Sequence, residues 1–127
     1  MIDVAKLSAE SRWRLMRFSE AFEKHDAKRR IVHQQISPDS LEVGVTEVLD
    51  DQAFGEYLGC RMTLKNCDEA EILDLVDRSD PASVLDRNDI FTATVEQREQ
   101  AHAEMKRVEA TLVAIGKQCT EYIKNLK

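Results

Sequence analysis

The sequence AHAEMKRVEATLVAIGKQCTEYIKNL, from Ala101 to Leu126, decides the fold. Apolar or small side chains recur along it at spacings that alternate between four and three residues. They are Ala101, Met105, Val108, Leu112, Ile115, Cys119, Tyr122 and Leu126. This heptad pattern predicts one long helix with a narrow apolar seam, which a second helix has to cover. Thr94 and Gln97 form a capping-box pattern, so we expect this helix to begin just after Thr94.

A second amphipathic pattern lies near the N-terminus and predicts another long helix, from about Ser8 to about Gln34. Its stripe consists of Val4, Leu7, Leu15, Phe18 and Phe22, which recur at spacings of three, four or their sums. This helix is one candidate partner for the C-terminal seam. The other is the same seam of a second chain, which would make a homodimer or a coiled-coil subunit of a larger assembly. The residues of such a pairing would be Met105, Val108, Leu112, Ile115, Cys119, Tyr122 and Leu126.

The stretch after the first helix supports two interpretations. Ser37-Pro38 is a typical helix start, and Leu41, Val45, Val48 and Leu49 follow with helical spacing. However, Leu41, Val43 and Val45 alternate, as do Leu58, Cys60, Met62 and Leu64, so a short hairpin within residues 40–65 is the alternative. We favour helices.

Further along, Asn66 and Glu69 form another capping-box pattern before a short helix that ends near Arg78. Its inward side would carry Ala70, Ile72, Leu73 and Val76. Asp80-Pro81 repeats the cap-and-proline start and opens a further helical turn.

The composition agrees with a single helical domain over residues 1–127. Four glycines and two prolines are too few for a fold with many turns, whereas 43% apolar and 33% charged residues suit a globular protein. We therefore predict an all-α fold of four to five helices, with the long N- and C-terminal helices packed together. The alternative is an α+β fold with the short hairpin.

Acidic residues are concentrated in the middle of the chain. Residues 34–89 hold four Lys or Arg against fourteen Asp or Glu, so this segment has a net charge of −10. The whole chain has a net charge of −6. The flanking segments 1–33 and 90–127 are slightly basic, at +3 and +1. Such unevenness indicates either an ordinary solvated face, set against the basic first helix, or a surface that attracts a partner of opposite charge.

Four central carboxylates recur every third residue, which on a helix produces a ridge of like charge: Asp68, Glu71, Asp74 and Asp77. Their mutual repulsion does not help the chain to fold, and a basic protein surface would relieve it. The first helix carries a second candidate, because Trp13, Met16 and Arg17 lie roughly opposite its apolar stripe. A large aromatic beside an arginine is typical of protein interfaces, although Trp13 could also belong to the core.

A metal site is the alternative of a different class. Glu20 and Glu23, with Glu71 and Asp74, give E-x-x-E and E-x-x-D, and divalent cations such as Mg²⁺ prefer oxygen ligands. This spacing is similar to the metal-binding pattern of the all-α nucleotide pyrophosphohydrolases, and the resemblance implies a metal-dependent nucleotide hydrolase. It covers four residues, the interval between the two halves is longer than in that family, and the usual extra glutamate beside Glu20 is absent.

Other classes find little support in the sequence. There is no nucleophile motif and no glycine-rich phosphate loop, so we expect no cofactor. The basic residues of the first helix are scattered and interrupted by acids, which argues against nucleic acid, and no run of 18 apolar residues suggests a membrane partner. Three widely spaced cysteines suit a reducing, cytoplasmic location. The sequence thus favours a non-enzymatic protein-binding protein, of the adaptor, chaperone, immunity or inhibitor type.

Overall fold

The computed structural model describes residues 2–35, 39, 43–83 and 93–126, and its core is a helical bundle. The long helices are α1 (Ala9–Lys28) and α5 (Val95–Lys124), with α2 (Asp51–Thr63) and α3 (Ala70–Ser79) between them. Two 3-10 turns, η1 (Val4–Lys6) and η2 (Leu64–Asn66), precede α1 and follow α2. The long terminal helices pack together, so the predicted all-α bundle is confirmed.

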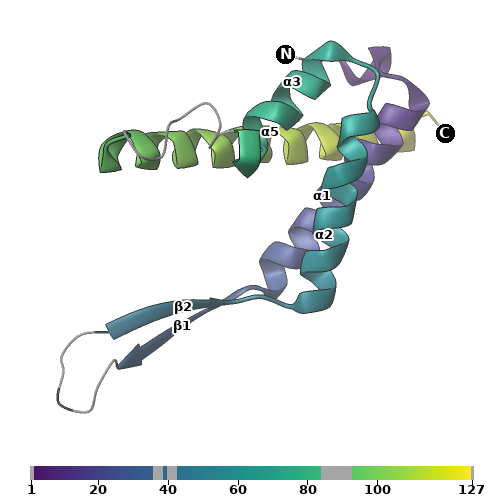
Figure 1. Ribbon diagram of the computed structural model, residues 1–127. Helices are drawn as coiled ribbons and strands as arrows, with labels where there is room; N and C mark the ends of the chain where they lie inside the picture. The colour runs from purple at the N-terminus through teal and green to yellow at the C-terminus, as the bar shows by residue number, and fades with distance from the viewer. Residues whose placement is uncertain (1, 36–38, 40–42, 84–92, 127) are drawn as a thin grey trace.

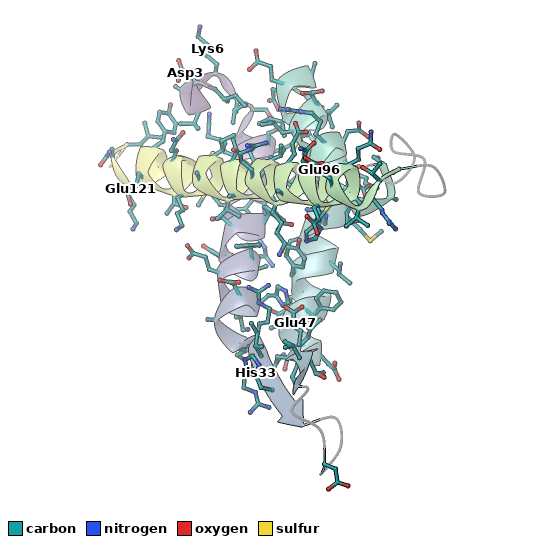
Figure 2. All side chains as sticks on the ribbon, turned by 90° about the vertical axis from the view of Figure 1, so that its left-hand side faces the viewer. Asp3, Lys6, His33, Glu47, Glu96 and Glu121 are labelled. Carbon is teal, nitrogen blue, oxygen red and sulfur yellow. The ribbon has the colours of Figure 1, made fainter. Side chains whose placement is uncertain are left out.

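A β-hairpin interrupts the helical pattern. Strand β1 (Arg30–Gln35) pairs antiparallel with β2 (Val43–Val48), in the register Arg30↔Val48 to Gln35↔Val43. In Figure 1, α1 leads down to this hairpin and α2 returns beside α1, while the hairpin projects away from α5. Figure 2 places His33 and Glu47 on this arm, at the opposite end of the molecule from Asp3 and Lys6.

Two sequence predictions in this region are wrong. The first helix ends at Lys28 instead of Gln34, because the β-branched Ile31 and Val32 follow and a second strand is available to pair with them. Residues 43–48 form a strand, as their alternation suggested, and not the favoured helix. The other half of the predicted hairpin, Leu58 to Leu64, is helical in α2 and η2 instead. The Ser37-Pro38 start and Leu41 lie outside the described residues.

Helix α5 begins as its sequence predicts. The Thr94 hydroxyl accepts a hydrogen bond from Gln97 N (3.1 Å), and Gln97 Oε1 accepts one from Thr94 N (2.9 Å). This capping box satisfies donors that the first turn would otherwise leave without partners. Figure 2 shows the full length of α5 between Glu96 and Glu121, running across α1 and α2.

The core forms where α1 crosses α5. Leu15 and Phe18 of α1 and Leu112 and Cys119 of α5 are all fully buried there. At the crossing, a Cβ added to Gly116 would lie 2.6 Å from Ser19 Cβ and would also collide with the Leu15 carbonyl. The Ser19 hydroxyl donates a hydrogen bond to Val113 O (3.0 Å) at the same place. The two helices therefore touch backbone to backbone, which only glycine allows.

Aromatic side chains join α1 to α2. The buried His25 ring lies 5.0 Å from the Tyr57 centroid and 5.2 Å from the Phe54 centroid, and the Phe18 and Phe22 rings complete the cluster. Contacts of this kind contribute beyond the area they bury. These contacts hold α1 and α2 side by side. The two helices then form the walls of the groove described below.

Helix α3 begins differently from its prediction. Its N-cap residue is Glu69, and no side chain caps the first turn, so the Asn66–Glu69 capping box is not formed. Instead, Glu69 Oε1 accepts a hydrogen bond from Ser8 N (2.9 Å), at the N-cap of α1. The carboxylate therefore connects the starts of two helices. Burial raises the pKa of Glu69, but the nearby Ser11 hydroxyl and Ser8 N–H outweigh this effect, so the net pKa is lowered.

The lowered pKa of Glu69 predicts an acid-sensitive contribution to stability. Ionised Glu69 stabilises the folded chain above its ordinary pKa of 4.5, and this contribution is lost as the pH falls through that range and below. We expect Glu69→Gln to lower the free energy of unfolding at neutral pH by at most about 1 kcal/mol, because the carboxylate is partly solvated. Urea unfolding of both proteins across the acid range measures this. The difference between them should shrink towards low pH, and a constant difference would contradict the assignment.

Candidate protein-binding surfaces

A surface groove lies between α1 and α2, with a volume of about 870 Å³. Trp13, Arg14, Arg17, Glu20, Ala21 and Lys24 of α1 line it, with Glu56, Gly59, Cys60 and Thr63 of α2 and Asn66 of η2. We call it the α1–α2 groove. Ala21 has only a methyl group and Gly59 has no side chain, so neither residue fills the space between the helices.

Trp13 is the most conspicuous residue of the groove. Its side chain is 57% exposed, and the guanidinium carbon of Arg17 lies 5.5 Å from its ring centroid. This distance suits a cation–π contact, which holds the indole and the guanidinium together at the rim. Met16 differs from these two, because it is partly buried against the core cluster. Of the three residues that the sequence grouped, the structure brings Trp13 and Arg17 together at the groove and turns Met16 inward.

The cations of the groove are unevenly neutralised. Lys24 pairs with Glu56 across the groove (Nζ–Oε2 3.3 Å). Arg14 donates a hydrogen bond to the neutral Asn66 carbonyl (3.2 Å). Among the residues that the structure describes, neither Arg14 nor Arg17 forms an ion pair. Sequence reasoning missed Arg14 as a site residue, because only the pairing of α1 with α2 and η2 gives it this position.

The four ridge carboxylates are all exposed, on α3 and just before it. We call Asp68, Glu71, Asp74 and Asp77 the acidic ridge. Asp74 Oδ2 pairs with Arg78 Nε of the same helix (3.2 Å), while Asp68 and Glu71 form no ion pair with any described residue. Exposed pairs such as Asp74–Arg78 contribute little and can exchange partners readily. The ridge therefore presents carboxylates that a cationic partner could reach.

Elsewhere, the chain's own cations pair with three other carboxylates of the central segment. Glu47 pairs with Arg29 (3.2 Å), Asp80 with Lys65 (3.4 Å), and Glu56 with Lys24 as described above. The attraction expected from the whole central segment is thus reduced, and within the described residues Asp68 and Glu71 are the ridge carboxylates for which no ion pair is seen.

The apolar seam of α5 finds a partner inside the chain. Val108, Leu112, Ile115 and Cys119 are buried, and helices α1 and α3 of the same chain both pack against α5. Met105 and Tyr122 are partly buried, and the Arg12 guanidinium carbon lies 5.0 Å from the Tyr122 ring centroid. Only Leu126, beyond the end of the helix, is largely exposed, at 65%. Of the two partners considered for the seam, the structure shows the first helix of the same chain.

The four acids of the predicted metal site do not come together. Within residues 2–35, 39, 43–83 and 93–126, no three His, Cys, Asp or Glu side chains are placed to share a metal ion. Glu20 lines the α1–α2 groove, Glu23 pairs with Lys117 of α5, and Glu71 and Asp74 lie on the acidic ridge. The E-x-x-E and E-x-x-D spacings therefore do not correspond to one site.

Comparison with known proteins adds no relative: no family model, no curated protein and no solved structure matches this chain. No helix in the described part of the chain is long and apolar enough to cross a membrane.

Proposed function

We propose that this chain is a non-enzymatic protein-binding protein, of the adaptor, chaperone, immunity or inhibitor type, whose acidic ridge engages a basic surface of another protein. The observation that carries the proposal is the exposure of Trp13 beside Arg17 at the α1–α2 groove. Large aromatics and arginines dominate the binding energy of protein interfaces. Covering the exposed part of this indole, on the order of 100–150 Å², would contribute about 3 kcal/mol to binding.

The acidic ridge supports the proposal through its negative charge. Asp68 and Glu71, which form no ion pair with any described residue, would steer a cationic partner during encounter and fix its orientation, while each exposed pair adds only a few tenths of a kcal/mol. The ridge would therefore select the kind of partner, and Trp13 would supply apolar affinity.

The test is affinity capture followed by a direct binding measurement. The tagged chain is used to capture partners, a basic protein identified by mass spectrometry is purified, and its affinity is measured by calorimetry. The ridge variant Asp68→Asn/Glu71→Gln/Asp74→Asn/Asp77→Asn removes four charges and keeps their shapes. We expect this variant to bind roughly tenfold more weakly, from four exposed pairs.

The matched control removes four exposed carboxylates that do not contact α3: Asp51→Asn on α2 and Glu96→Gln/Glu99→Gln/Glu121→Gln on α5. It changes the net charge equally and should leave the affinity unchanged. Equal weakening in both variants would attribute the effect to net charge, and no weakening in the ridge variant would remove the ridge from the interface. Either result contradicts the proposal.

A further inference from the structure

We infer that a second copy of this chain supplies a basic surface for the acidic ridge: α3 of each copy docks in the α1–α2 groove of the other, forming a symmetric dimer. This inference rests on the proposed function, because it names a partner for the same two surfaces. Helix-in-groove docking is a common way for proteins to recognise one another, and this chain carries both the helix and the groove.

The charges of the groove and of the acidic ridge are complementary. The groove lining holds three cations against two carboxylates, a net charge of +1, and neither Arg14 nor Arg17 pairs with a carboxylate among the described residues. The ridge presents Glu71, which pairs with no cation in the described part of the chain, and Asp74 in an exposed pair that can be exchanged. Arg14 and Arg17 are three residues apart on α1, and Glu71 and Asp74 are three apart on α3. Each pair therefore spans about 4.5 Å along its helix, so the two sets of charges match in spacing.

The groove and α3 also expose apolar side chains, and one wall of the groove is open. Leu73 of α3 is 37% exposed beside the ridge, and Trp13 is 57% exposed at the groove. Gly59 in the groove wall has no atom within 4 Å of the position where a Cβ would be, so this wall is open. A glycine inside a helix costs about 1 kcal/mol relative to alanine, and no contact within the described chain explains that cost at Gly59. The missing side chain at Gly59 leaves room for a partner helix to approach α2 closely.

The fold of one chain keeps α3 outside its own groove. Within one chain, α3 packs against α5, and the groove is formed by α1 and α2, so α3 does not occupy its own groove. Since every copy carries both surfaces, two copies can make the contact twice about a twofold axis, which closes the assembly. The apolar seam of α5 is already buried inside the chain and is not needed for this dimer.

The experiment uses two charge-reversal variants of the full chain. Arg14→Glu/Arg17→Glu makes the groove acidic, and Glu71→Lys/Asp74→Lys makes the ridge basic. In each homodimer both contacts then become repulsive, so we expect each variant alone to sediment as a monomer. In an equimolar mixture, the acidic groove meets the basic ridge, and the unchanged groove meets the unchanged ridge. We therefore expect the mixture to form a heterodimer of twice the 14.5 kDa chain mass.

Native mass spectrometry distinguishes this heterodimer from either homodimer. The matched control is Lys106→Glu/Arg107→Glu on the exposed side of α5, which has the same charge change as the groove variant and should remain dimeric. A wild-type chain that stays monomeric at every accessible concentration would overturn the inference, as would a mixture of the two variants that stays monomeric.

A measurement on the unaltered protein covers the case in which a variant does not fold. Trp13 is the only tryptophan, so its fluorescence reports on the groove alone. As the protein concentration rises through the dimer transition, we expect the emission to shift to the blue and iodide quenching to fall. A dimer whose Trp13 remains fully quenchable would place the interface elsewhere and refute the docking. Self-association without a foreign basic partner would contradict only the proposed function, and a foreign partner bound by a strict monomer would contradict only this inference.

Discussion

Gly116→Ala should lower the free energy of unfolding by about 2–4 kcal/mol, the largest effect we expect from adding a single methyl group. The added carbon would lie 2.6 Å from Ser19 Cβ and against the Leu15 carbonyl, which is backbone and cannot rotate away. Relief requires α1 and α5 to separate, which also weakens the Ser19–Val113 hydrogen bond. The better helix propensity of alanine offsets about 1 kcal/mol of this loss.

Thermal unfolding followed by circular dichroism measures the effect, and we expect the melting temperature to fall by roughly 10 °C. The matched control is Gly55→Ala, where the added carbon meets nothing within 4 Å. That substitution should stabilise the chain by about 0.5–1 kcal/mol through helix propensity alone. If both alanine variants changed stability in the same direction, α1 and α5 could not cross at Gly116 as closely as described.

The close contact at Gly116 also shows where sequence reasoning stops. The seam of α5 could be predicted because heptad spacing and the Thr94 cap are local features that few other structures satisfy. Gly116 lies next to the seam position Ile115, and a pattern of apolar residues gives a glycine no weight. Its role depends on which helix crosses there, and that is a property of the fold rather than of the local sequence.

The hairpin was only half predicted, for a related reason. Val43 and Val45 alternate as strand residues do, but so do Leu58, Cys60 and Met62, which are helical in α2. Short apolar runs support either structure, and the choice is made by a partner strand that is distant in sequence. Here the partner is Arg30–Gln35, which continues directly from α1.

The candidate surfaces divide in the same way. The exposure of Asp68, Glu71, Asp74 and Asp77 follows from their spacing, because the buried Ile72 and Val76 leave that side of α3 to solvent. The α1–α2 groove could not be anticipated, since it exists only because His25, Phe54 and Tyr57 hold two helices together. The exposure of Trp13 needed the structure too, because the N-terminal pattern was compatible with a helix buried on two sides.

Arg61→Met should be the most damaging substitution among the polar residues, lowering the free energy of unfolding by about 3 kcal/mol. Arg61 connects three helices: Nη1 lies 3.1 Å from Glu109 Oε2 of α5, and Nη2 donates to the carbonyl and, at 3.2 Å, to the hydroxyl of Ser79 in α3. The Arg61 and Glu109 side chains are only 12% and 18% exposed. Methionine keeps the apolar stem but leaves Glu109 without its cation and the Ser79 carbonyl without this donor.

Tyr57 keeps this network ordered after the change. Its hydroxyl donates to Glu109, and burial together with the neighbouring Glu109 raises the pKa of Tyr57 well above its ordinary value of 10.0. Tyr57 therefore remains a neutral donor throughout the range in which the chain can be studied. Tyr57 lessens the isolation of Glu109 but supplies no positive charge, so it does not replace Arg61.

A double-mutant cycle separates the ion pair from the packing around it. The coupling energy between Arg61→Met and Glu109→Gln should exceed 1 kcal/mol, because both groups are largely removed from solvent. The matched control is the pair Lys24→Met and Glu56→Gln. Lys24 Nζ lies 3.3 Å from Glu56 Oε2, and the two side chains are 47% and 44% exposed. There the coupling should stay below about 0.5 kcal/mol. Equal coupling at the two pairs would mean that Arg61 is solvated as freely as Lys24, and α2, α3 and α5 would then have to be joined by apolar packing alone.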